Sequence, residues 1–322
     1  MINIRPQTDL SKEVAQTIRQ PSTALFTVSS KDRFVDYADR QLNYATQYRS
    51  AYDFLIARNQ SIFNGFFTRI GLTEIVFPYT IPNINEKTQT FRFTITGGPN
   101  PGTFTKTISI GFTLPSGIAA KMQTAIQTEL PGFTMDYGNA GLPRFLWDTG
   151  NPNIEITFIP LPYNSAIFPY TSNVKQLYDL LGLPPTESLF GINFGGDTFC
   201  SFTEYIDVVC SQITYNQSLR DGSSQRISRD SIARVYIQGE GSQTFLTPGD
   251  PNFCPAGCSP FTIYRQYSTP KQIQWSPNQP LGQVQIQVYD DQGEILQELD
   301  AGLGIDPVPG TDFNLTFLVS EN

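Results

Sequence analysis

The sequence predicts a mainly β protein, an eight-stranded single jelly-roll sandwich with an inserted small α+β domain. Short segments rich in β-branched and aromatic residues recur along the chain, separated by Gly, Pro, Asn and Asp turns. Three such segments precede residues 86–198 and five follow them, whereas helical spacing appears only between. Eight short strands with an excursion between the third and fourth are typical of a jelly roll, although a Greek-key barrel would give a similar pattern.

The first three strands are expected at 25–29, 52–57 and 66–79. The first is β-branched and alternates before charged residues interrupt it. The third is long and apolar, and we expect it to end at Pro78 and Pro82. Proline suits the exit of a strand and does not suit a central strand, because it lacks the N–H that the ladder needs.

The inserted segment is expected to start with a β-hairpin, formed by 91–95 and 106–112 around the glycine-rich turn at 97–102. A helix should follow from an N-cap at Ser116 and end before Pro131, since apolar residues recur every four positions there. The glycine-rich turn is no phosphate-binding loop, because no Gly-Lys-Ser/Thr follows it.

Two further strands of the insert are expected at 133–136 and 154–160, and a second short helix from Ser172 to Gly182. The insert then reads as a ββαββα unit. The five strands after it are expected at 205–215, 232–238, 261–275, 284–289 and 313–319. The predicted organisation is an N-terminal arm (1–22), a first jelly-roll part (23–85), the inserted α+β domain (86–198) and a second jelly-roll part (199–322).

Composition argues against several classes of function. The chain has no histidine, which removes Ser-His-Asp and Cys-His catalysis and histidine-ligated metals. Its net charge of −8 makes specific nucleic-acid binding unexpected. No apolar run approaches eighteen residues, so membrane insertion is not expected, and the N-terminus does not resemble a signal peptide. We therefore predict a protein that is not an enzyme.

Four cysteines raise the question of a metal site. Cys200 and Cys210 lie ten residues apart, and Cys254 and Cys258 bracket a Pro-Ala-Gly loop. That spacing is atypical of a four-thiolate zinc site. We expect free thiols with no metal and no cofactor, and the redox state of the four cysteines stays open.

One segment resembles a catalytic motif. Asp148-Thr149-Gly150 matches the active-site signature of aspartic proteases, which need two carboxylates sharing a proton. No second Asp-Ser/Thr-Gly occurs in the chain. The favoured interpretation is a β-turn bounding a strand, with a protease kept as an alternative.

Several short motifs occur in an order known from one group of viral proteins. In order they are 26–33 (FTVSSKDR), 52–54 (YDF), 66–82 (with the pattern IxLxEIxFPxxIP), 180–183 (LLGL), 205–208 (YIDV), 270–275 (PKQIQW) and 288–293 (VYDDQG). Together they resemble penton (vertex) or minor capsid proteins of large icosahedral double-stranded DNA viruses. These viruses are the virophages, polinton-like viruses and nucleocytoplasmic large DNA viruses. The likeness spans roughly residues 23 to 320.

The resemblance implies a viral structural protein of the virion, located at the capsid vertex and assembled inside the host cell. Five copies would close the vertex as a homopentamer and contact hexamers of the major capsid protein; other minor capsid proteins are further candidate partners. The resemblance does not separate a penton from a peripentonal minor capsid protein, and the Cys254–Cys258 loop matches nothing in the family.

A receptor- or glycan-binding module, such as a lectin or spike head, remains the alternative, because jelly rolls also serve in that role. Four aromatic residues of the insert, Tyr137, Trp147, Tyr163 and Tyr170, would then stack on sugars. The competing interpretation is that these side chains form the core of the insert.

Charge is distributed unevenly and indicates candidate assembly contacts. Residues 1–69 hold nine basic and six acidic residues, whereas the chain beyond Lys271 holds eight acidic and no basic ones. We predict contacts from the arm through Arg5, Lys12 and Arg19, and from the acidic stretch through Asp290, Asp291, Glu294, Glu298, Asp300 and Asp306. The acidic stretch would pair with a basic surface on the next subunit or on the major capsid protein, or it is a solvated edge. The arm reaches beneath the shell, or it is a frayed terminus.

Overall fold

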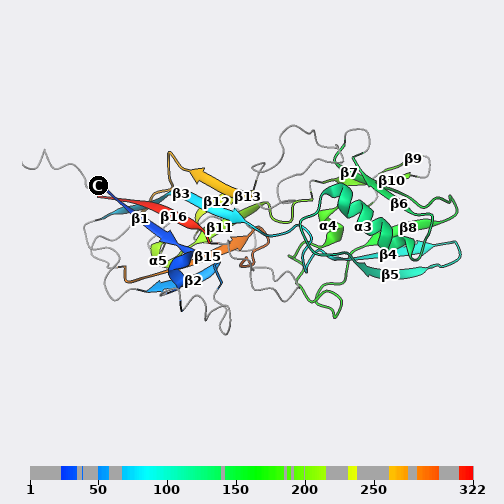
Figure 1. Ribbon diagram of the computed structural model, residues 1–322, viewed down its shortest axis with the longest axis horizontal. Coiled ribbons are helices and arrows are strands. Elements are labelled where there is room, and N and C mark those ends of the chain that lie inside the picture. Colours follow the sequence, from blue (N-terminus) through cyan, green and yellow to red (C-terminus); the bar gives the residue numbers. More distant parts are fainter. Residues whose placement is uncertain are drawn as a thin grey trace, which may run out of the picture.

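Two antiparallel sheets packed face to face form one half of the molecule, and the inserted segment forms the other (Figure 1). The structure is a computed structural model. It describes residues 23–34, 38, 50–57, 67–138, 142–184, 187–189, 192–198, 200–214, 231–237, 261–274, 281–296 and 312–321.

The strand order of the two larger sheets is that of a jelly roll. One sheet has the order β1 (Thr23–Ser29), β16 (Asn314–Ser320), β3 (Arg69–Tyr79) and β13 (Phe261–Gln266), with the short β14 (Ile273–Gln274) also pairing with β3. The other has the order β12 (Ser231–Tyr236), β11 (Tyr205–Val209), β15 (Gln283–Asp290) and β2 (Asp53–Ala57). The strands of these two sheets, without β14, can be numbered one to eight along the chain. The two sheets then have the strand orders 1-8-3-6 and 5-4-7-2. This interleaving of two Greek keys confirms the predicted jelly roll.

Alternation of buried residues along strands such as β15 and β16 builds much of the core of the sandwich. In β15 every second residue is buried, so Val284, Ile286 and Val288 point inwards. Aromatic rings fill the centre between the sheets: Phe313 lies 5.3 Å from Phe77 and 5.9 Å from Phe54, measured between ring centroids. Such ring pairs stabilise a core beyond the area they bury.

In its described part, the inserted segment contains two further sheets and two helices. One sheet has the order β5 (Gly102–Thr107), β4 (Thr90–Thr96) and β8 (Glu155–Ile159), and the other has β6 (Thr134–Tyr137), β7 (Arg144–Asp148), β10 (Ile192–Asp197) and β9 (Glu187–Leu189). Helix α3 (Pro115–Gln127) buries Ile118, Met122 and Ile126. Trp147 of β7 meets Phe158 of β8 edge to face at 5.2 Å, which joins the two sheets.

The helices differ from the sequence prediction at their starts. Helix α3 has Leu114 as its N-cap and Pro115 in its first turn, so Ser116 is inside the helix. The fixed φ of proline suits this position, and the missing N–H costs nothing there. Helix α4 (Leu177–Leu180) is one turn long and does not include Ser172. It starts where the Asp179 carboxylate accepts the N–H of Gln176 at 3.0 Å.

Several strand bounds were also predicted wrongly. The hairpin's second strand is residues 102–107, not 106–112; the segment 261–275 divides into β13 and β14; and β7, β9 and β10 were not expected. The strand expected at 205–215 ends at Val209, because the chain turns into α5 (Ser211–Thr214).

Pro78 lies inside β3, an inner strand, where a proline was not expected. The pairing of β3 with β16 stops at Val76, whereas its pairing with β13 continues to Tyr79. At Pro78 the strand therefore has a neighbour on one side only, and it is effectively an edge there. A proline is tolerated at such a position because no second neighbour requires its N–H.

The jelly roll has two distinct ends. Thr23 pairs with Ser320, and Arg69 also pairs with Ser320, so β1 begins and β16 ends at one end. β1 ends, β16 begins and β3 leads into the insert at the other end. Figure 1 shows the C-terminus and the insert at opposite extremes of the long axis. Among the described residues, no helix is long and apolar enough to cross a membrane.

Candidate assembly surfaces

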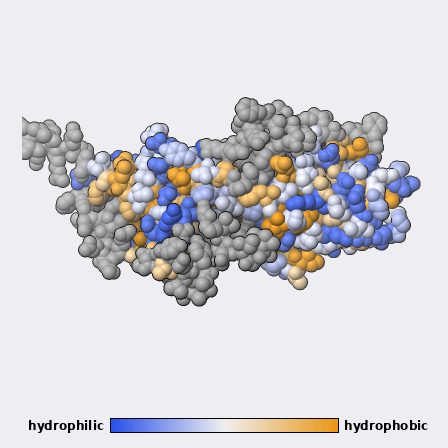
Figure 2. All heavy atoms as spheres, viewed as in Figure 1, coloured by the Kyte–Doolittle hydropathy of each residue, from blue (hydrophilic) through white to orange (hydrophobic). Residues whose placement is uncertain are grey.

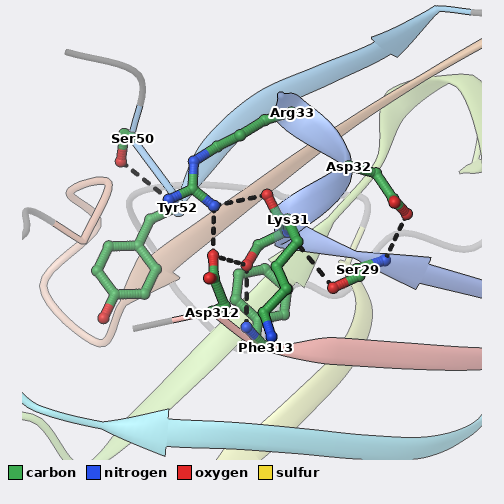
Figure 3. A network of polar contacts seen from close by, with 9 residues as sticks. Ser29, Lys31, Asp32, Arg33, Ser50, Tyr52, Asp312 and Phe313 are labelled. Atoms are coloured by element: carbon green, nitrogen blue, oxygen red, sulfur yellow. Dashed lines mark hydrogen bonds and ion pairs between the residues drawn. The ribbon is translucent and has the colours of Figure 1, made fainter. Parts of the chain in front are cut away.

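A buried ion pair joins the end of β1 to the start of β16 at the insert-facing end of their sheet (Figure 3). Arg33 sits in the 3-10 turn after β1, and Asp312 precedes β16. The Arg33 guanidinium donates to Asp312 Oδ1 at 2.5 Å and to the Ser30 carbonyl at 2.6 Å. Only 4% of the Arg33 side chain and 8% of the Asp312 side chain are exposed.

Ser30 completes this network. Its hydroxyl donates to Asp312 Oδ1 at 3.0 Å and accepts the N–H of Phe313 at 2.9 Å, and its own N–H donates to the Phe313 carbonyl. The aromatic core begins at Phe313, so the network fixes the end of β1 against the start of β16. A charge this deeply buried is stable only when it is paired and hydrogen-bonded. The network therefore makes this end of the sandwich rigid.

Of the predicted acidic contacts, Asp290 is used inside the chain. It ends β15 with 3% of its surface exposed, and its Oδ1 accepts the N–H groups of Gln292 at 3.0 Å and Glu294 at 2.8 Å. Burial raises the pKa of Asp290, and the N–H donors of the turn and Lys87 oppose that rise. This carboxylate organises a turn, and a contact with a neighbouring subunit stays a prediction for it.

The turn that Asp290 organises also contacts the inserted segment. Glu294 forms an ion pair with Lys87, which lies between β3 and β4. Gln292 accepts the N–H of Lys175 at 2.9 Å and donates to the Phe202 carbonyl at 3.3 Å. We call residues 290–294 the junction turn. They connect the sandwich to the segment that leads into the insert, at Lys87, and to the segment that leads out of it, at Phe202.

The remaining predicted contacts lie outside the described residues. These are Arg5, Lys12, Arg19, Glu298, Asp300 and Asp306. The arm leads into Thr23, at the end of the sandwich away from the insert, whereas Asp290 lies at the insert-facing end.

The outer strands of the sandwich carry exposed apolar side chains. Leu25 of β1 is 70% exposed and Tyr264 of β13 is 53% exposed, on the two outer strands of one sheet; Leu55 and Tyr236 occupy the outer strands of the other. Figure 2 shows apolar and polar atoms interspersed over this half of the molecule. β1 contains neither charge nor proline, the features that normally protect an outer strand from pairing.

The protease-like motif forms a turn. The Gly150 N–H donates to Asp148 Oδ1 at 2.8 Å, and the Thr149 hydroxyl donates to the carbonyls of Asn151 and Ile154 at 2.9 Å each. Gly150 has φ +72°, and a Cβ there would lie 2.8 Å from the Gly132 carbonyl oxygen. The segment is a turn after β7, as its interpretation as a strand boundary predicts.

The four aromatic residues considered for glycan stacking do not form one open platform. Tyr137 and Trp147 are buried in the insert. Tyr163 and Tyr170 are partly buried against Phe168, with ring centroids 5.6 and 4.9 Å away. Their main role in this structure is packing.

The cysteines fall into two groups. Cys200 and Cys210 are buried free thiols, and Cys254 and Cys258 lie outside the described residues. Burial raises the pKa of Cys210 to about 11 and raises that of Cys200 as well, which disfavours a reactive thiolate. In the part of the chain that the structure describes, no group of three or more Cys, Asp or Glu side chains could hold a metal ion.

Solved structures similar to this chain include two viral ones. No family model matches the chain, and no curated protein matches it. The chain is similar to the mavirus penton protein, with a TM-score of 0.48 and 10% identity over 94% of this chain and 100% of that chain. It is also similar to a cryo-EM structure of the Sputnik virophage, with a TM-score of 0.44 and 13% identity over 94% of this chain and 98% of that chain.

Proposed function

We propose that this chain is a structural capsid protein that forms the pentameric vertex of an icosahedral virion. The observation that carries the proposal is the jelly-roll strand order 1-8-3-6 and 5-4-7-2 with a long insertion between its third and fourth strands. This architecture is the one that the sequence resemblance implies. The domain division at 22/23, 85/86 and 198/199 is part of the proposal.

Rigidity supports a structural role. The Arg33–Asp312 pair fixes two strands of one sheet to each other, and Phe313 packs against Phe54 of the other sheet. The junction turn attaches the insert by an ion pair and by hydrogen bonds to two chain passages. A capsid protein has to keep its shape while its surfaces bind neighbours, so such cross-links between distant segments suit the task.

The outer strands supply surfaces for a ring. A closed ring requires head-to-tail contacts, in which two different surfaces of each subunit meet. Leu25 and Tyr264 lie on opposite edges of one sheet, so one edge of a subunit faces the other edge of the next. The ends of the long axis then remain free. The arm contacts the major capsid protein hexamers or other minor capsid proteins from one end, and the insert extends outwards from the other.

Cross-linking tests this arrangement. Leu25→Cys and Tyr264→Cys are made separately, mixed and oxidised, with each single variant alone as the control. A head-to-tail ring gives cross-linked dimers only in the mixture, and the double variant gives a ladder that ends at five copies. Dimers of Leu25→Cys alone would indicate a twofold contact and contradict the ring. Five-membered rings that do not cross-link would show that the outer strands are not the contact surface, and the proposed vertex role would stand.

A further inference from the structure

Three chain segments meet at the junction turn. Lys87 belongs to the passage into the insert, Lys175 to the insert itself, and Glu204 to the passage back to β11. Besides its contact with Gln292, Lys175 donates from Nζ to the Ser201 carbonyl at 3.2 Å and lies 3.5 Å from the Glu204 carboxylate. The junction turn therefore adds polar contacts between sandwich and insert to the hydrophobic core that the two parts share.

Asp291 belongs to the junction turn, and its carboxylate is not fully hydrogen-bonded. Its Oδ1 atom is buried and has no hydrogen-bond partner among the described residues. Lys175 supplies the positive charge nearby, but it also faces the Glu204 carboxylate at 3.5 Å. A buried carboxylate with one oxygen unsatisfied is costly, whereas a protonated carboxyl has no charge to compensate.

Every segment around Asp291 contributes titratable or charged groups: three carboxylates, two lysines and two tyrosines. They are Asp290 and Glu294 in the junction turn, Lys87 between β3 and β4, Lys175 and Tyr170 in the insert, Glu204 before β11, and Tyr79 at the end of β3. Lys87 is already paired with Glu294 and Lys175 is shared with Glu204. Asp291 in its charged form therefore shares Lys175 with Glu204.

We propose that the junction turn is a pH-sensitive latch between sandwich and insert, which a proton on Asp291 closes. With the proton in place, the turn keeps its contacts to Lys175 and Phe202 without a charge buried beside Asp290. When Asp291 loses its proton, the charged carboxylate is better solvated if it moves towards water. The turn then gives up its contacts to Lys175 and Phe202. The latch works whether or not the protein forms a vertex.

The direction of the pH dependence follows from the burial of the group. Burial raises the pKa of Asp291 to about 6, Asp290 and Glu204 raise it further, and Lys175 opposes them. A carboxyl group whose pKa is raised in the closed state stabilises that state when it is protonated. This stabilisation is complete below the ordinary pKa of 3.8 and is lost as the pH rises through about 6. The linkage relation gives about tenfold more opening at about pH 7.5 than at about pH 5.

Hydrogen exchange measures the opening. The readout is the protection of peptides that cover 170–176, 200–204 and 289–296, corrected for the intrinsic pH dependence of exchange. We expect protection to be about tenfold higher at about pH 5 than at about pH 7.5 in the unaltered chain. Asp291→Asn removes the titrating group at this position and should lose most of the difference in protection between the two pH values. Asp136→Asn, on the exposed surface of β6, is the matched control and should behave as the unaltered chain does.

A second measurement keeps the proposal testable if Asp291→Asn fails to fold. The carboxyl carbon of Asp291 in the unaltered, isotope-labelled chain is titrated by NMR, and its midpoint is expected near pH 6. A midpoint near the ordinary value of 3.8, or protection that does not change with pH, would overturn the latch. Equal pH dependence in the unaltered chain and in Asp291→Asn would overturn it as well.

Discussion

The Arg33–Asp312 pair offers a sharp test of how the sandwich is held together. Asp312→Ala removes the carboxylate that accepts hydrogen bonds from Arg33 and Ser30. The guanidinium would remain buried, since only 4% of the Arg33 side chain is exposed, and it would lose the carboxylate of Asp312 that it contacts. Breaking a buried pair in this way typically costs about 3–5 kcal/mol. That cost corresponds to roughly a thousandfold shift in the folding equilibrium.

Urea denaturation followed by tryptophan fluorescence and circular dichroism measures this loss. Asp312→Asn, which keeps the shape and an acceptor oxygen, should lose less than Asp312→Ala. The double variant Arg33→Met, Asp312→Leu should also lose less than Asp312→Ala, because replacing both charges leaves none uncompensated. Asp32→Ala is the matched control, since Asp32 lies in the same turn but is exposed. A loss below about 1 kcal/mol for Asp312→Ala, the range of exposed ion pairs, would refute the reasoning.

The remaining predictions concern the insert and the thiols. Gly150→Ala should destabilise the chain by about 1–3 kcal/mol in urea denaturation, because φ is +72° and the Gly132 carbonyl oxygen would lie 2.8 Å from the new Cβ; an unchanged midpoint would contradict this. Trp147→Ala should cost about 3–5 kcal/mol through the cavity it leaves, and a loss under 1 kcal/mol would place the side chain outside the core. Cys200 and Cys210 should react with a thiol reagent only after unfolding, as mass mapping of the labelled peptides would reveal; rapid labelling of either in the native chain would show that it is accessible.

The jelly roll could be predicted because its strands follow local rules. β15 alternates buried and exposed residues, and the pattern is visible in Gln283–Asp290 without any knowledge of its neighbours. The position of the insert was visible as well, since helical spacing starts only after the third strand. The register between strands was not, because it depends on partners far away in the sequence.

The errors have physical causes. Tyr205 to Tyr215 appears as one strand because its residues are β-branched and aromatic, yet the chain turns after Val209, where the Thr214 hydroxyl donates to the Cys210 carbonyl. Val174 was assigned to a helix, but it packs in a separate small cluster with Leu161 and Phe168. The first error thus has a local cause, whereas in the second a tertiary contact overrides local propensity.

The polar contacts that matter most here could not be predicted from the sequence. Arg33 and Asp312 are 279 positions apart, and Lys87 and Glu294 are 207 apart. The acidic stretch attracted attention through its charge, but charge alone does not reveal that Asp290 faces inwards. For Asp290 the sequence identified the segment, and only the fold shows that its carboxylate holds a turn together.

Native mass spectrometry of the purified chain tests the central claim most directly. We predict a dominant species with five times the 35.9 kDa mass of the chain, which dissociates to monomers without a stable dimer as an intermediate. A dominant dimer, trimer or hexamer would contradict it, and so would a chain that stays monomeric at all protein concentrations.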